Sequence, residues 1–130
     1  MNWRGLSHAL LRIAAGLMFS FHGAQKLFGV WGRDAVDLAS QSGVGGIIEF
    51  FGGLLIVIGL QTRWAAFICS GTMAVAFWQY HVMGSWAEMG ASALHPLLNR
   101  GELAALYCFV FFFLWGNGGG PYSVDTSRGK

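Results

Sequence analysis

The first long apolar stretch, over residues 6–29, reads LSHALLRIAAGLMFSFHGAQKLFG. A helix over it can cross a bilayer, because ~20 apolar residues at 1.5 Å rise span roughly 30 Å of hydrocarbon. Its four ionisable residues lie within about 80° of one another at 100° per residue, and they are His8, Arg12, His22 and Lys26. Since a charge facing lipid costs at least ~2.5–3.5 kcal/mol at the bilayer centre, we expect this stripe to face other helices or a polar cavity. The alternative is that His8 and Lys26 snorkel to the interface.

The composition indicates a membrane protein of one domain, spanning 1–130. Of the 130 residues, 55% are hydrophobic and 11% are charged, whereas soluble domains carry about 25% charged residues. The formal net charge of +2 comes without a basic run, so it does not indicate nucleic-acid binding. The first apolar run continues past Arg12 and His22 without a small-residue cleavage site, so we expect a retained helix and not a signal peptide.

The second apolar stretch, over 44–60, carries an acid among glycines. Gly45, Gly52 and Gly59 recur every seven residues, with Gly46 and Gly53 beside them, and small residues on one face let membrane helices approach closely. Glu49 lies four residues after Gly45 and three before Gly52. We therefore expect Glu49 to lie on the packed glycine face, buried against protein and not against lipid.

Working outward from these two stretches, the sequence predicts an all-α, antiparallel up-down four-helix bundle in the membrane. The predicted segments are helices over about 6–28, 44–60, 64–83 and 100–115, and a polar tail over 122–130. Between the first two helices we expect a loop with one short surface helix over Asp34–Ser40, and we expect Asn99 to cap the last helix. Four spans place both termini on one side, where five Lys and Arg residues against three opposite favour the cytoplasm.

Polar residues of the predicted helices gather at the end opposite the termini. Lys26 and Glu49 each lie within about 10 Å of that surface by helix rise, so they can pair. A pocket of acid, histidine and lysine beside aromatic rings suits a ring with carbonyl oxygens, such as a quinone, which those groups can hydrogen-bond and protonate. We assign as candidate catalytic residues His22, Glu49 and Lys26. The candidate cofactor-binding residues are Trp78, Tyr80, His81 and Glu102.

The same residues suit two other interpretations. A Lys26–Glu49 pair can serve only to lock helices together, because structural ion pairs also occur in buried positions. The polar stripe can instead form a proton path or a small transporter, although residues 13–21 offer only Ser20 as a polar group.

Metal and redox motifs are not evident in the sequence. Lysine is not a usual metal ligand, so the i, i+4 pair of His22 and Lys26 does not indicate a metal site. Cys69 and Cys108 fit no metal or redox spacing. Because no motif for flavin, haem or an iron–sulfur cluster is present either, a role in electron transfer implies a partner protein.

Three separated motifs resemble those of the DoxX family. They are R-x-x-x-G and F-x-x-H-G-x-x-K-L-F-G within 12–29, E-x-x-G-G and G-L-x-T-R within 49–63, and the ending GGGPYSVD over 118–125. The resemblance implies a bacterial or archaeal four-helix inner-membrane protein; some relatives are membrane subunits of thiosulfate:quinone oxidoreductases, and others are linked to thiol and oxidative-stress handling. The polar positions it carries over are Arg12, His22, Lys26, Glu49, Arg63, Ser123 and Asp125. The tail has one residue more than the commoner family form and lacks its arginine.

We therefore expect a multi-pass protein of the bacterial inner membrane that serves as the quinone-facing subunit of an oxidoreductase or redox-stress complex. In that role Glu49 and His22 handle protons, Lys26 holds a carbonyl oxygen or tunes Glu49, and Trp78 or Tyr80 lines the ring. Quinone is the expected cofactor, without metal, flavin or haem, and a redox partner protein and the lipid bilayer are the expected partners. The glycine faces also suit a homo-oligomer. The alternative is a non-catalytic membrane scaffold or anchor.

Overall fold

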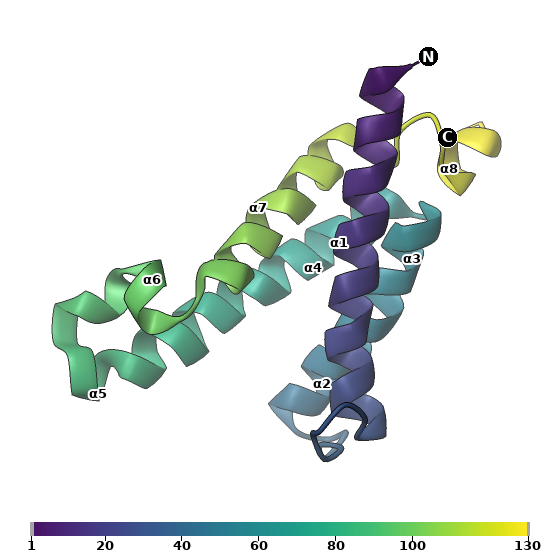
Figure 1. Ribbon diagram of the computed structural model, residues 1–130. Helices are drawn as coiled ribbons and strands as arrows, with labels where there is room; N and C mark the ends of the chain where they lie inside the picture. Colours follow the sequence, from purple (N-terminus) through teal and green to yellow (C-terminus); the bar gives the residue numbers. More distant parts are fainter. Residues whose placement is uncertain (1, 130) are drawn as a thin grey trace.

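The structure, a computed structural model, describes residues 2–129, and its regular elements are all helical. Because these residues contain no strand, the predicted all-α class is confirmed for them. Figure 1 shows two helical hairpins that lie close together near the chain termini and diverge toward the opposite end. Both termini lie at the end where the hairpins meet.

The first hairpin is formed by the N-terminal half of the chain. Its elements are α1 (Trp3–Phe28), α2 (Gln41–Ile47), η1 (Ile48–Gly52) and α3 (Gly53–Ile58), of which the last three form one continuous helical run with a π-helical centre. Helix α1 begins where the Asn2 side chain accepts a hydrogen bond from the Gly5 nitrogen at 3.0 Å. It ends at Gly29, whose φ of 65° is a conformation that glycine adopts without strain.

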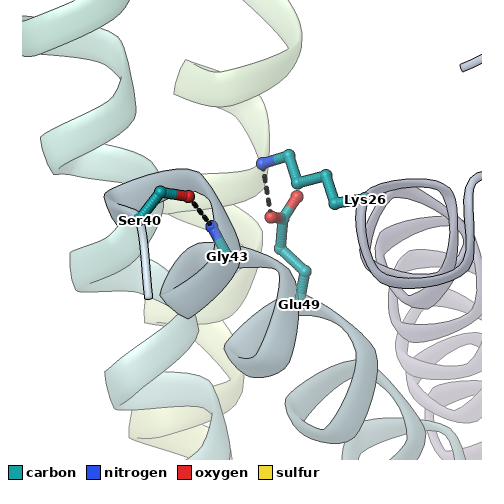
Figure 2. Close-up of polar contacts among 4 residues, drawn as sticks. All are labelled: Lys26, Ser40, Gly43 and Glu49. Atoms are coloured by element: carbon teal, nitrogen blue, oxygen red, sulfur yellow. Dashed lines mark hydrogen bonds and ion pairs between the residues drawn. The ribbon is translucent and has the colours of Figure 1, made fainter. Parts of the chain in front are cut away.

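The connection between α1 and α2 contains no helical residue, so the surface helix predicted over Asp34–Ser40 is wrong. Ser40 instead caps α2, and its hydroxyl accepts a hydrogen bond from the Gly43 nitrogen at 3.0 Å (Figure 2). A serine in this position satisfies one of the free N–H groups of the first turn. The helix therefore begins at Gln41, three residues before the predicted start.

Glycines on both helices bring the backbones of the first hairpin into contact. A Cβ atom on Gly23 would lie 2.7 Å from the Gly46 oxygen, and one on Gly16 would lie 2.7 Å from the Gly53 oxygen. The close-packed face of the returning helix is therefore the Gly46–Gly53 stripe. The Gly45–Gly52 stripe does not make this contact: a Cβ atom on Gly52 would meet the Cys69 sulfur of α4 at 2.7 Å, and one on Gly45 would lie 4.0 Å from Lys26 Nζ.

The C-terminal half of the chain forms the second hairpin. Its long elements are α4 (Thr62–Ala76), its π-helical extension η2 (Phe77–Val82), and α7 (Glu102–Asn117). The connection between them, predicted as a loop, consists of short helical pieces: η3 (Met83–Ser85), α5 (Trp86–Met89), η4 (Gly90–Leu94) and α6 (Pro96–Asn99). The start of α4 is capped by Asp125, whose carboxylate accepts from the nitrogens of Gln61 at 2.7 Å and Thr62 at 2.8 Å.

Asn99 does not cap α7, contrary to the prediction, because that helix begins after Gly101. The Asn99 side chain closes the preceding turn instead. Its oxygen accepts from the Gly101 nitrogen at 2.7 Å and its nitrogen donates to the Ala93 oxygen at 2.6 Å. The predicted polar tail, whose last residue lies outside the described range, also contains a short helix, α8 (Val124–Ser127).

The molecule places polar residues inside and large apolar residues outside. The small core contains Phe19, Ile56 and Phe111, all fully buried, and Phe19 contacts Phe111 at a centroid distance of 4.8 Å. The buried polar and charged residues are Arg12, Ser20, Glu49, Thr62, Ser70, Asn99 and Ser123. Many large apolar side chains are exposed as well, whereas soluble domains expose only small apolar patches.

By length and composition, one helix of the described residues is a candidate membrane span, the run over 41–58. Helix α7 is equally apolar in character but shorter. The four predicted helices nevertheless all exist, and each observed boundary lies within three residues of the predicted one.

Candidate functional site: a polar cleft between the hairpins

Where the two hairpins diverge, they enclose a cleft of about 380 Å³. Its walls come from α1, α2, η1, α4, η2 and α7, together with two arginines of the connections. Five of the seven predicted site residues line it: His22, Lys26, Glu49, Tyr80 and His81. The structure therefore gathers most of the predicted site in one place.

The centre of the cleft is an ion pair between the two helices of the first hairpin. Lys26 Nζ lies 2.6 Å from Glu49 Oε2 (Figure 2). The Glu49 side chain is 4% exposed and that of Lys26 is 22% exposed, so the ammonium group faces the cleft and the carboxylate lies behind it. As predicted, Glu49 is buried against protein. Its position on the π-helical segment η1 is notable, since such segments occur frequently at functional sites.

Tyr107, which sequence reasoning did not select, lines the cleft from α7. It is 5% exposed, and its hydroxyl oxygen has no hydrogen-bond partner among the described residues. The great majority of buried polar side-chain atoms have a partner, so this hydroxyl is available as a donor to a further group; the Thr62 hydroxyl, near the tail, is a second such group. The signal in the sequence was a phenol within an otherwise apolar span, since a buried tyrosine hydroxyl usually has a hydrogen-bond partner.

Two histidines contribute to opposite walls of the cleft. The His22 ring packs edge-on to Tyr107 with centroids 6.2 Å apart, and it is exposed toward the cleft. His81 lies on the π-helical segment η2, and its Nδ1 contacts the Asn99 oxygen at 3.1 Å. Since a carbonyl only accepts, His81 Nδ1 carries the proton, which leaves its Nε2 to accept in the neutral ring.

Two predicted site residues lie outside the cleft. Trp78 is exposed and packs edge-on against Phe77, and Glu102 is exposed in the first turn of α7. Neither is among the residues that line the cleft, whereas Arg33 and Arg100, which were not predicted, are. The cleft is consequently rich in positive charge, with Glu49 as its acid.

The other half of the helix 1 stripe belongs to a second cluster, near the termini. Arg12 is 2% exposed and donates to the oxygens of Ile56 at 2.9 Å, Val57 at 3.3 Å and Tyr122 at 3.1 Å, and also to that of Gly119. These contacts fasten the C-terminal tail to α1 and α3. The inward orientation predicted for Arg12 is confirmed, and its donors are occupied by backbone carbonyls.

Comparison with known proteins identifies the family. The sequence model of the DoxX family matches residues 7–82, more than half of the chain. The chain belongs to the DoxX family. A relative from Haemophilus influenzae, described as an uncharacterized protein, is 36% identical over 126 residues, which cover 91% of this chain and 87% of the relative. No solved structure matches.

The match confirms the resemblance seen in the motifs. The chain is thus a membrane-type protein of the DoxX family. The matched span contains the ion pair of Lys26 and Glu49 and a third residue of the cleft, His22. The tail motif lies outside that span, but Asp125 caps α4 and Tyr122 accepts from Arg12. The motifs therefore divide between the cleft and the cluster that fastens the tail.

The described residues contain no group of three His, Cys, Asp or Glu side chains placed to hold a metal ion. Both cysteines are free thiols. Cys69 is buried against Gly52, and Cys108 accepts a hydrogen bond on its backbone oxygen from the Ser70 hydroxyl at 2.8 Å. The two thiols thus contact different neighbours and take no part in the cleft.

Proposed function

We propose that this DoxX-family protein is a multi-pass inner-membrane protein that binds a quinone in the cleft, as the quinone-facing subunit of an oxidoreductase or redox-stress complex. One observation carries the proposal: the Lys26–Glu49 pair lies in the same cleft as the Tyr107 hydroxyl, which is buried without a partner. A cleft that combines a charged pair with an unused buried donor is suited to a ligand that has oxygen acceptors on an apolar frame.

The surface supports the membrane part of the proposal. Large aromatic and aliphatic side chains are exposed along all four long helical runs, for example Met18, Phe51, Phe67 and Phe109. The runs of 26 residues in α1 and 16 in α7 measure about 39 Å and 24 Å at 1.5 Å per residue. Helix α1 exceeds the roughly 30 Å of the hydrocarbon core and α7 falls short of it, so the proposed four-span bundle, with both termini on the cytoplasmic side and the cleft toward the opposite face, rests chiefly on the exposed apolar side chains.

The residues of the cleft fit a quinone. Its volume of about 380 Å³ falls in the roughly 300–1,000 Å³ range of ligand pockets. Lys26 offers a donor for one carbonyl oxygen, Tyr107 offers a second donor, and Phe19 and Tyr80 offer ring surface. A bound quinone would supply the capacity to accept electrons and protons. Glu49, held against Lys26 and away from solvent, is the group placed to hold a proton at its carboxylate.

An electron donor belongs to the proposal as well. The sequence carries no motif for flavin, haem or an iron–sulfur cluster, so we expect a partner protein to deliver the electrons. Arg33 and Arg100 at the cleft, which belong to the connections between helices, are placed where such a partner would approach.

Quinone binding to the purified protein tests the proposal directly. We expect a short-chain ubiquinone or menaquinone analogue to raise the melting temperature dose-dependently, since a ligand at 100 times its Kd stabilises a protein by about 2.7 kcal/mol. Glu49→Gln and His22→Ala should abolish the shift, whereas Glu88→Gln, an exposed acid on α5 outside the cleft, should keep it. A folded wild type that shows no shift at any concentration would refute quinone binding.

The scaffold alternative also has an observation in its favour. The Lys26–Glu49 pair joins α1 to η1 at the place where Gly23 and Gly46 bring those helices into contact. A pair in that position contributes to packing whether or not it binds a ligand. The ion-pair variants considered in the Discussion separate the two roles.

A further inference from the structure

A second cavity, of about 410 Å³, adjoins the cleft between the first hairpin and α4. The two cavities have six lining residues in common: Lys26, Ser42, Glu49, Met73, Ala76 and Tyr80. They therefore lie side by side as two compartments, with the ion pair at the boundary between them. Away from that boundary the second compartment is lined mainly by apolar groups, including Val44, Ile48 and Val75.

The second compartment reaches from the start of α2, where Gln41 and Ser42 line it, to the side of the molecule at Gly71. Gly71 lines it and lies nine residues after Thr62, the first residue of α4, which corresponds to about 14 Å along a helix. A Cβ atom on Gly71 would meet no atom within 4 Å. Val44 and Val75, which also line the opening, are half exposed. The opening thus lies near the middle of the helical run that α4 and η2 form together.

We infer that this lateral opening admits the hydrocarbon tail of a lipid-soluble quinone whose ring occupies the polar cleft. The inference rests on the proposed function and narrows its substrate class to quinones that carry an isoprenoid or alkyl chain. A ligand with a polar ring and an apolar tail matches a space with a charged compartment and an apolar one. At mid-depth the tail would leave the protein directly into lipid, where its methylene groups stay out of water.

Paired analogues and a blocking substitution test the inference. The analogues share one ring, and one is tailless whereas the other carries two isoprene units. Gly71→Phe fills the opening, and the free space at its Cβ position makes the substitution compatible with the fold. Gly116→Phe is the matched control, because it places the same side chain at an α7 glycine with equally free space, away from both compartments. Each analogue partitions into detergent to the same extent with either variant. The ratio of its affinities for Gly71→Phe and Gly116→Phe therefore reports on the binding site alone.

We expect Gly71→Phe to weaken the tailed analogue about tenfold while leaving the tailless one unchanged, since tenfold corresponds to the lost burial of about two methylene groups, a part of one isoprene unit. Gly116→Phe should change neither affinity. If Gly71→Phe does not fold, Val75→Trp narrows the same opening from the next turn and should give the same pattern.

The outcomes distinguish a failure of the tail path from a failure of quinone binding itself. If the tailless analogue binds the wild type but Gly71→Phe alters both analogues equally, or alters neither, the tail does not pass through this opening and the quinone site stands. If neither analogue binds the folded wild type, the proposed function fails and the inference fails with it.

Discussion

Replacing Gly23 with alanine is expected to force apart the two helices that hold the ion pair. An alanine Cβ at this position would lie 2.7 Å from the Gly46 oxygen and 2.7 Å from the Phe50 Cα, and it would also clash with the Phe50 nitrogen. Nonbonded atoms prefer separations of about 3.5–4.0 Å, so relief requires a movement of roughly 1 Å. Because the atoms met are backbone atoms, no side-chain rotation can supply it.

The expected loss of stability follows from two opposing effects. Overpacking of this kind typically costs 1–3 kcal/mol, and a rigid backbone contact favours the upper part of that range. Alanine regains about 1 kcal/mol over glycine inside a helix. We therefore expect Gly23→Ala to lower the free energy of unfolding by about 2 kcal/mol. Gly71→Ala, which meets no atom within 4 Å, should raise it by up to about 1 kcal/mol.

Reversible unfolding in mixed micelles, followed by far-ultraviolet circular dichroism, measures both variants against the wild type. The rise in melting temperature caused by the quinone analogue should also be smaller for Gly23→Ala than for the wild type, because Lys26 and Glu49 lie on the two helices that separate. If Gly23→Ala is as stable as Gly71→Ala, the close approach of α1 and η1 does not depend on glycine and the packing argument is wrong.

Two further predictions concern the cleft itself. Lys26→Met should cost about 3–5 kcal/mol of stability, because it leaves the Glu49 carboxylate buried and unpaired, and the double variant Lys26→Met/Glu49→Leu should regain most of it; additive losses in a double-mutant cycle would contradict the pairing. A stable double variant that keeps cellular function would favour the scaffold, and one that folds but loses quinone binding would favour the site. Tyr107→Phe should keep or slightly raise stability, since an unpartnered buried hydroxyl costs about 1–3 kcal/mol, yet it should weaken the quinone analogue; equal affinity in a binding titration would remove Tyr107 from the site.

The pairing of Lys26 with Glu49 could be predicted because helix geometry fixes depth. A rise of 1.5 Å per residue places each residue at a known distance from the end of its helix, and two antiparallel neighbours then bring opposite charges to the same level. The spacing of the glycines did not determine which face of the second helix contacts α1. A period of seven fits both the Gly45–Gly52 stripe and the adjacent Gly46–Gly53 stripe, and the choice is made by the positions of Gly16 and Gly23 on the partner helix.

The direction in which a side chain points was harder to predict where the helices are π-helical. Trp78, Tyr80 and His81 lie on η2, in which hydrogen bonds span five residues and not four. An extrapolation at 100° per residue loses its register across such a segment, so Tyr80 and His81 reach the cleft while Trp78 does not. Nothing in the local residue pattern marks a π-helical turn, and the sequence therefore gives the depth of these residues without their orientation.

One helix supplies charged residues to two clusters, and their hydrogen bonds show how different the clusters are. The Arg12 guanidinium donates to four backbone carbonyl oxygens and is shielded from solvent, so it has little capacity left for a ligand. In the cleft, Lys26 holds one carboxylate oxygen and remains partly exposed, and the Tyr107 hydroxyl is unused. Groups that are already satisfied serve the fold, whereas donors left open in a buried place require a further partner. A buried hydroxyl without a partner among the described residues occurs near the tail as well, on Thr62, so it is the combination of the Tyr107 hydroxyl with the partly exposed Lys26 in one cleft that favours the end where the hairpins diverge.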